Sequence, residues 1–228
     1  MSASPARVAA YYAPEADDPL AEAAATWLGR DAETGAPVPQ PDLPGIAEVT
    51  ADARLYGFHA TLKPPMRLAD GVTWADMLGA TRRIADTIAP FPLPALAPQA
   101  LHGFVALRET LPSQALQGLA DACVAGLDTL RAPPGEAELA RRRRKPLSPL
   151  QDAMVTRWGY PYVFQTWFFH MTLTRRLDEA QRAFWIEAAA AHFADALRTP
   201  RMVRAITLFT QAEPGLPFRI GERVTLRG

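Results

Sequence analysis

The chain has 228 residues, of which 49% are hydrophobic and 21% charged, a composition typical of a soluble globular protein. Lys and Arg together number 24, as do Asp and Glu, so there is no basic excess of the kind that proteins of long nucleic acids carry. The single cysteine excludes an internal disulfide framework and a cysteine-based zinc site. No apolar stretch has the length of a signal peptide or a membrane span, so we expect a cytoplasmic protein without membrane partners.

The first half of the chain alternates between short strands and helices. Apolar periodicity and proline or glycine breaks predict strands at 7–12, 58–62 and 101–108, helices at 20–28 and 73–88, an irregular segment at 29–49 and a proline-rich connector at 90–98. Pro64 and Pro65 are expected to end the second strand. Thr73 and Asp76 have the spacing of a helix-capping box.

The second half has a similar order of elements. The pattern predicts helices at 113–131 and 179–197, a partly helical segment at 136–162, and strands at 163–173, 203–210 and 217–226. Because strands and helices mix without a strict βαβ alternation, the expected fold class is α+β. We expect residues 1–228 to form one domain with two lobes.

A short repeat relates the two halves. The letters FHATL at 58–62 recur as FHMTL at 169–173, with the two histidines 111 residues apart. This spacing predicts an internal duplication with a pseudo-twofold axis. Side chains alternate between the faces of a strand, so His59 and Thr61 share one face, and so do His170 and Thr172. The two polar pairs are then expected to meet across one cleft.

Two imidazoles and two hydroxyls in one cleft suit phosphodiester hydrolysis. A neutral imidazole accepts a proton from water, and a protonated imidazole donates one to the leaving oxygen. The hydroxyls of Thr61 and Thr172 can hydrogen-bond the phosphate oxygens. This chemistry needs no metal or cofactor. The repeat makes His59 and His170 near equivalents, so the sequence leaves open which one is the base.

Two H-x-T-h tetrads (h is hydrophobic) about a hundred residues apart resemble the two-histidine (2H) phosphoesterase superfamily. The resemblance implies a bilobal α+β fold with antiparallel sheets, outer helices and a central cleft. The segments YYAP at 11–14, WLGRD at 27–31, YGFHATLKPP at 56–65 and RWGYPYV at 157–163 are similar to one branch of it, proteins assigned to phosphonate metabolism and encoded near carbon–phosphorus lyase genes.

The branch resemblance implies a small phosphorylated sugar as the partner and substrate, with 5-phosphoribosyl 1,2-cyclic phosphate the first candidate. One alternative is a 2′,3′-cyclic phosphodiesterase acting on RNA ends or nucleotides. Another is a module that binds a phosphorylated ligand without turnover, although two titratable imidazoles would be superfluous there.

Five further residues are candidates for contact with substrate. By strand alternation, Lys63 falls on the face of His59, and Arg176 on the face of His170 if that strand extends far enough. One tyrosine of the first strand could line the cleft, and Tyr12 is the candidate. Tyr160 and Tyr162 belong to an aromatic region whose hydroxyls could reach a phosphate. The five consecutive cations at 141–145 are expected to be a local patch that attracts phosphate at most.

Overall fold

Among residues 5–228, which the computed structural model describes, seven strands form one antiparallel sheet and two form a second, smaller one. The large sheet has the order β4-β5-β6-β2-β1-β8-β9. Its strands, in chain order, are β1 (Arg7–Tyr12), β2 (Ala60–Met66), β4 (Leu96–Leu101), β5 (Phe104–Glu109), β6 (Met171–Thr172), β8 (Ala205–Gln211) and β9 (Arg219–Thr225). The small sheet pairs β3 (Phe91–Leu93) with β7 (Arg201–Val203).

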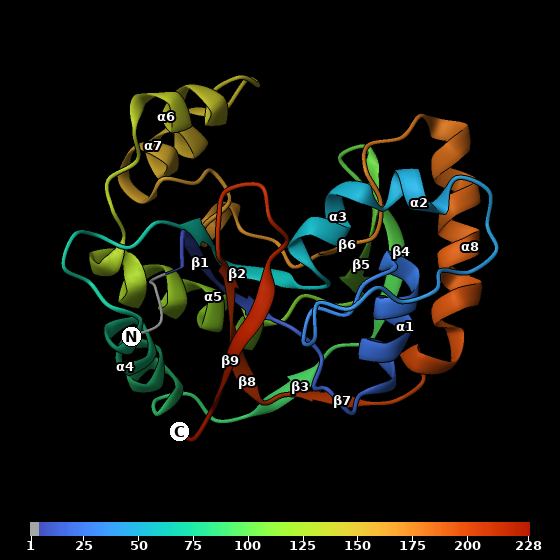
Figure 1. Ribbon diagram of the computed structural model, residues 1–228, viewed down its shortest axis with the longest axis horizontal. Coiled ribbons are helices and arrows are strands. Elements are labelled where there is room, and N and C mark those ends of the chain that lie inside the picture. The colour runs from blue at the N-terminus through green and yellow to red at the C-terminus, as the bar shows by residue number, and fades with distance from the viewer. Residues whose placement is uncertain (1–4) are drawn as a thin grey trace.

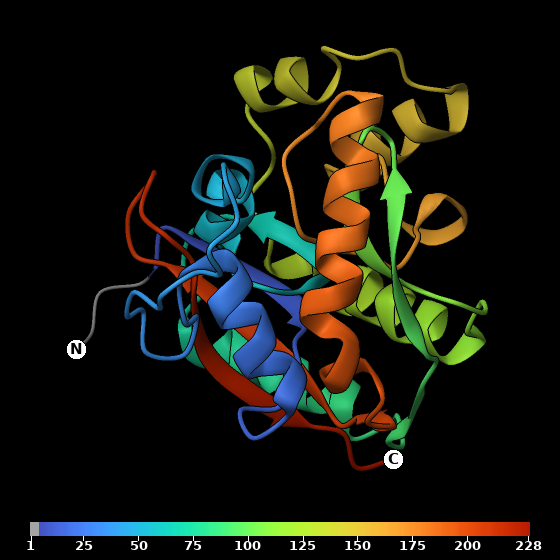
Figure 2. The same cartoon turned by 90° about the vertical axis from the view of Figure 1, so that its right-hand side faces the viewer.

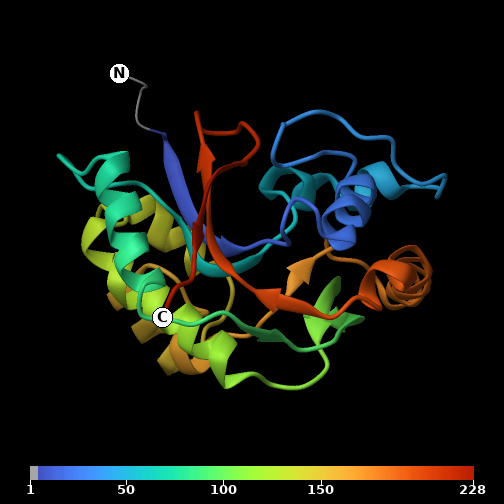
Figure 3. The same ribbon diagram turned by 90° about the horizontal axis from the view of Figure 1, so that it is seen from below.

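The main helices lie outside the sheet in two groups. The helices are α1 (Pro19–Leu28), α2 (Ile46–Val49), α3 (Ala51–Tyr56), α4 (Trp74–Ala85), α5 (Gln114–Leu127), α6 (Glu136–Arg142), α7 (Pro149–Trp158) and α8 (Glu179–Leu197). Helices α4 and α5 pack together at one end of the molecule, and α1 and α8 at the other (Figure 1). Helix α8 runs beside α1 and contacts β4 (Figure 2). The view from below shows strands between the two groups (Figure 3). This arrangement confirms the α+β class.

The two halves of the sheet join where the two repeats meet. Strands β2 and β6 are neighbours, and Ala60 of one pairs with Met171 of the other in antiparallel register. These residues hold the same position in their H-x-T-h tetrads, 59–62 and 170–173. The pseudo-twofold relation therefore passes between them, and the two tetrads lie side by side at the centre of the sheet.

Two tryptophans connect each tetrad to the opposite half of the chain. The indole Nε1 of Trp27, in α1, donates to the carbonyl of Leu173 at 3.1 Å. The indole of Trp167 donates to the carbonyl of Thr61 at 2.7 Å. Each bond satisfies a backbone acceptor that short strand pairing leaves free, because β6 has only two residues.

The prediction that Pro64 and Pro65 end the second strand is wrong. Strand β2 continues through both prolines to Met66, which pairs with Val8 of β1. The register with β1 shifts once between this pair and the pair of Lys63 with Ala10. It shifts a second time between Lys63 and Thr61. The prolines sit at the first of these irregularities, where a missing N–H costs no regular ladder bond.

The second register shift also changes the direction of Lys63. The prediction that Lys63 shares the face of His59 is wrong, because its side chain is 1% exposed and points toward α5. Its Nζ donates to Asp128 Oδ1 at 2.8 Å and to the carbonyl of Val124 at 3.0 Å. The ammonium group is therefore a buried partner of Asp128 on the helical side of the sheet.

Two other segments differ from the predicted strands. Residues 164–166 form a 3₁₀ turn, with Phe164 in the left-handed region, so the strand predicted at 163–173 is reduced to β6. Residues 102–103 form the hairpin turn between β4 and β5, with positive φ at both His102 and Gly103, so the strand predicted from 101 begins at 104. The helix predicted at 179–197 is confirmed at both ends.

We expect Asp128→Asn to lower the free energy of unfolding by about 3 kcal/mol, because it leaves the buried Lys63 ammonium without its carboxylate. Urea denaturation measures this loss. A matched control is Asp152→Asn, which breaks an exposed ion pair with Arg143 and should cost about 0.5 kcal/mol. Equal losses in the two variants would contradict the importance of the buried pair.

Candidate active site

The four polar tetrad residues share one face of the sheet. Antiparallel pairing of Ala60 with Met171 sets His59 across from Thr172, and His170 across from Thr61. We call the surface that these four side chains share the tetrad face. Phe169, Met171 and Leu173 alternate with the polar residues and are fully buried in the core behind. The structure thus brings the two predicted pairs together.

Both histidines make the same hydrogen bond to the backbone. Nδ1 of His59 lies 2.8 Å from the carbonyl of Gly57, and Nδ1 of His170 lies 3.2 Å from the carbonyl of Phe168. A carbonyl can only accept, so each Nδ1 carries the proton and donates it. In the neutral imidazole this leaves the lone pair on Nε2, which is the atom available for acid–base chemistry in both histidines.

The surroundings of the imidazoles favour their neutral forms. The pKa of His59 is lowered to about 4, mainly by burial; the Gly57 carbonyl opposes this shift and the nearby His170 adds to it. Burial is also the main cause that lowers the pKa of His170; the Phe168 carbonyl opposes this shift, and the positive charge of Arg108 adds to it. Without substrate, both groups are therefore predominantly neutral at pH 7.

The tyrosine of β1 that reaches the tetrad face is Tyr11 and not Tyr12. The Tyr11 ring stacks on His59 with ring centroids 3.7 Å apart and planes 20° apart. Tyr12 points into the main core and packs on Phe169, so its choice as a substrate contact is wrong. Burial raises the pKa of Tyr11 well above its usual value, which keeps the phenol protonated. Strand alternation alone could not decide which of the two adjacent tyrosines faces the cleft.

Tyr160 and Tyr162 belong to an aromatic wall beside the tetrad face. Their rings contact each other, and Tyr162 contacts Phe168, which in turn contacts His170. The guanidinium of Arg142, at the end of α6, lies 4.8 Å above the Tyr160 ring. Burial raises the pKa of Tyr160, and the charge of Arg142 opposes that rise. Both tyrosines thus lie near the histidines, on the segment that follows α7.

The arginine beside His170 is Arg108, which sequence reasoning missed. Strands β5 and β6 pair Ala106 with Thr172, so continuing that register sets Arg108 across from His170 on the tetrad face. The predicted Arg176 is exposed near Gly103 in the hairpin turn, and Arg175 forms an ion pair with Glu48. Only the order of strands in the sheet, which the sequence does not state, could have identified Arg108.

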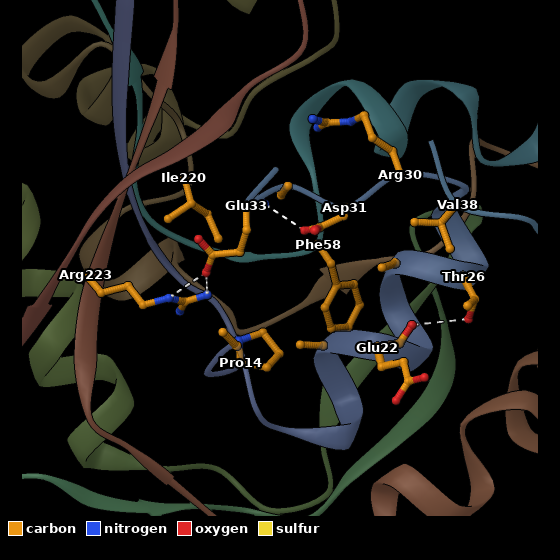
Figure 4. Close-up of a pocket in the computed structure, with 14 residues that line it drawn as sticks. Pro14, Glu22, Thr26, Arg30, Asp31, Glu33, Val38, Phe58, Ile220 and Arg223 are labelled. Carbon is orange, nitrogen blue, oxygen red and sulfur yellow. Dashed lines mark hydrogen bonds and ion pairs between the residues drawn. The ribbon is translucent and has the colours of Figure 1, made fainter. Parts of the chain in front are cut away.

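A separate cavity of about 440 Å³ lies between α1, the loop that follows it, and β9 (Figure 4). Its lining includes Phe58 and Glu22 but none of the four tetrad residues. Two of its acidic groups already have partners: Glu33 pairs with Arg223, and Asp31 accepts the Glu33 amide (Figure 4). The chemistry of the repeats therefore points to the tetrad face rather than to this cavity.

Within residues 5–228, no group of three or more His, Cys, Asp or Glu side chains is arranged to hold a metal ion. In the same range, no helix combines the length and apolar character needed to cross a membrane.

Comparison with known proteins finds one protein family and two curated relatives. The family described as "Protein of unknown function (DUF1045)" matches residues 61–219. A ribose 1,5-bisphosphate phosphokinase PhnN of Janthinobacterium sp. (strain Marseille) is 41% identical over 236 residues, and one of Laribacter hongkongensis (strain HLHK9) is 40% identical over 222. The matches cover 100% and 96% of this chain but 52% of each relative, so the chain spans about half their length.

A solved structure has a more distant likeness. The crystal structure of E. coli LigT complexed with NADP+ aligns with 99% of this chain and 100% of its own, with a TM-score of 0.44 and 16% identity.

We expect both histidines to titrate below pH 6.5 in the substrate-free protein, because burial disfavours their charged forms. Two-dimensional ¹H–¹⁵N spectra of the imidazoles measure the pKa values and the tautomers together. At pH 7.5, His59 and His170 should both show a protonated Nδ1 and a free Nε2. The variants His59→Asn and His170→Asn assign the signals. A pKa above 6.5 or the opposite tautomer at either residue would contradict the geometry.

Proposed function

The chain belongs to the DUF1045 family, and we propose that it hydrolyses a small cyclic phosphodiester with His59 and His170 as its acid–base pair. The observation that carries the proposal is the matched pair of H-x-T-h tetrads on neighbouring strands, each with its histidine Nε2 free. A pair of equivalent imidazoles on one face suits a reaction that removes one proton and delivers another.

In the proposed reaction, water attacks the phosphorus of the cyclic ester. The neutral imidazole takes a proton from water at Nε2 as the new P–O bond forms. The ester P–O bond breaks on the opposite side, and the second imidazole, protonated, donates its Nε2 proton to the leaving oxygen. Thr61 and Thr172 donate hydrogen bonds to the non-bridging oxygens, where negative charge builds up in the pentacovalent species. The ring opens to a phosphate monoester.

The substrate's own charge prepares the acid. Both imidazoles are predominantly neutral when the site is empty, but a bound phosphate anion favours the charged form of the nearer one. Binding of substrate and uptake of a proton are therefore coupled. A neutral ester of the same shape would lack this effect.

The names of the relatives favour a particular substrate. A 5-phosphoribosyl 1,2-cyclic phosphate that breaks its P–O2 bond yields ribose 1,5-bisphosphate, the compound in the name of the two phosphokinases. The present chain contains no Gly-Lys dipeptide and hence no Walker A loop, so we do not propose kinase activity for it. We propose instead that it supplies ribose 1,5-bisphosphate, a product that a phosphokinase would consume, in phosphonate breakdown.

We expect metal-free wild-type protein to hydrolyse 5-phosphoribosyl 1,2-cyclic phosphate with chelator present, and His59→Ala and His170→Ala each to lose at least about 10³-fold in kcat. Phosphorus NMR of the product mixture measures both the rate and the position of ring opening. Ribose 1,5-bisphosphate is the expected product.

The control variant is His192→Ala, which removes a histidine of α8 that contacts Thr26 and the Ala23 carbonyl and does not lie on the tetrad face. It should retain activity. A nucleoside 2′,3′-cyclic phosphate is assayed in parallel. Preference for the nucleotide would favour the alternative phosphodiesterase. Folded wild type that binds the sugar phosphate without turnover would overturn the enzymatic proposal.

A further inference from the structure

The duplicated site is not symmetric in the strands that flank it. Strand β1 lies beside the first tetrad and β5 beside the second, so the pseudo-twofold relation exchanges them. Tyr12 is paired with Ala60 and Leu107 with Met171, which makes Tyr12 and Leu107 equivalent. One residue further on each strand, Ala13 is equivalent to Arg108. One lobe thus has a methyl group where the other has a guanidinium.

The Arg108 side chain lies on the tetrad face and forms no ion pair with a residue of its own strand. Val105 and Leu107 alternate with it and are fully buried in the core, so Arg108 points the other way, beside His170. Its neighbour Glu109 alternates to the core side, so the two charges attract each other but do not form an ion pair. The Nε of Arg108 is buried and has no hydrogen-bond partner among residues 5–228.

A buried guanidinium donor without a partner is costly, and the cost is removed when an anion binds. Arg142, the other arginine near the aromatic wall, also has a buried Nε without a partner, but its Nη2 lies 3.7 Å from the carboxylate of Glu138. Within the described part of the chain, Arg108 forms no ion pair with a carboxylate. The four tetrad side chains, two imidazoles and two hydroxyls, can already bind a phosphodiester, which carries a single negative charge. An additional cation in one lobe therefore matches a substrate that carries a further negative charge.

We propose that Arg108 binds a second phosphate group, so that the site is specific for cyclic phosphodiesters that also carry a phosphate monoester. This inference rests on the proposed phosphodiesterase function and assigns its specificity. The planar guanidinium binds phosphate oxygens through two parallel hydrogen bonds. Because the cation is in one lobe only, it also fixes the direction in which the ring enters. One ester oxygen then always faces the same histidine.

The test compares two substrates that differ only in the second phosphate: 5-phosphoribosyl 1,2-cyclic phosphate and ribose 1,2-cyclic phosphate. Wild type should prefer the first. Arg108→Gln should lower kcat/KM for it by about 100-fold, mainly through KM, because a charge-assisted contact is lost. For the substrate without the 5-phosphate, the same variant should change kcat/KM by less than about threefold. Arg108→Lys should restore part of the preference as a point charge.

Arg83→Gln, on the exposed side of α4, is the matched control and should leave both values unchanged. Far-UV circular dichroism and urea midpoints establish that each variant is folded. An equal loss on both substrates would assign Arg108 to the reacting phosphate and overturn the inference. Equal wild-type rates on both substrates would overturn it while leaving the phosphodiesterase intact. No wild-type turnover of any cyclic ester is instead a failure of the proposed function.

Discussion

A single backbone pairing, Ala60 opposite Met171, determines the geometry of the candidate site. Because these residues hold equal places in the two tetrads, their pairing sets both histidines and both threonines on one face at the spacing of adjacent strands. Strand β6 is too short to maintain that register by its own ladder. The hydrogen bonds of Trp27 and Trp167 hold each tetrad to the other half of the chain, so the register depends on the packing of both lobes.

The same packing controls the charge of the site. Each imidazole is held by a carbonyl two residues earlier and is enclosed by aromatic rings, Tyr11 over His59 and Phe168 beside His170. The carbonyl fixes the tautomer, and the enclosure lowers both pKa values. A site with neutral bases and an unpartnered guanidinium, that of Arg108, favours an anionic ligand that contributes charge when it binds.

The parts of the site that depend on local order could be predicted from the sequence, and those that depend on strand register could not. Alternation within five residues was enough to place His59 and His170. The same rule failed for Lys63, since a bulge between it and Thr61 reverses its direction. The helix at 179–197 was predictable from its apolar pattern. Arg108 could not be found in this way, because its neighbour on the tetrad face comes from a strand more than sixty residues later.

Duplication alone gives a site in which either histidine can be the base, and a cyclic diester can then bind in two opposite directions. A defined product requires an element that breaks the symmetry. In this fold the difference lies in the flanking strands β1 and β5. On the tetrad face, Tyr11 of one lobe has the small Ala106 as its equivalent in the other. Arg108 likewise has the small Ala13 as its equivalent. These differences between the two lobes leave the two tetrads alike. The proposed catalytic groups can therefore remain symmetric while the phosphate group that Arg108 is proposed to bind decides which ester bond is broken.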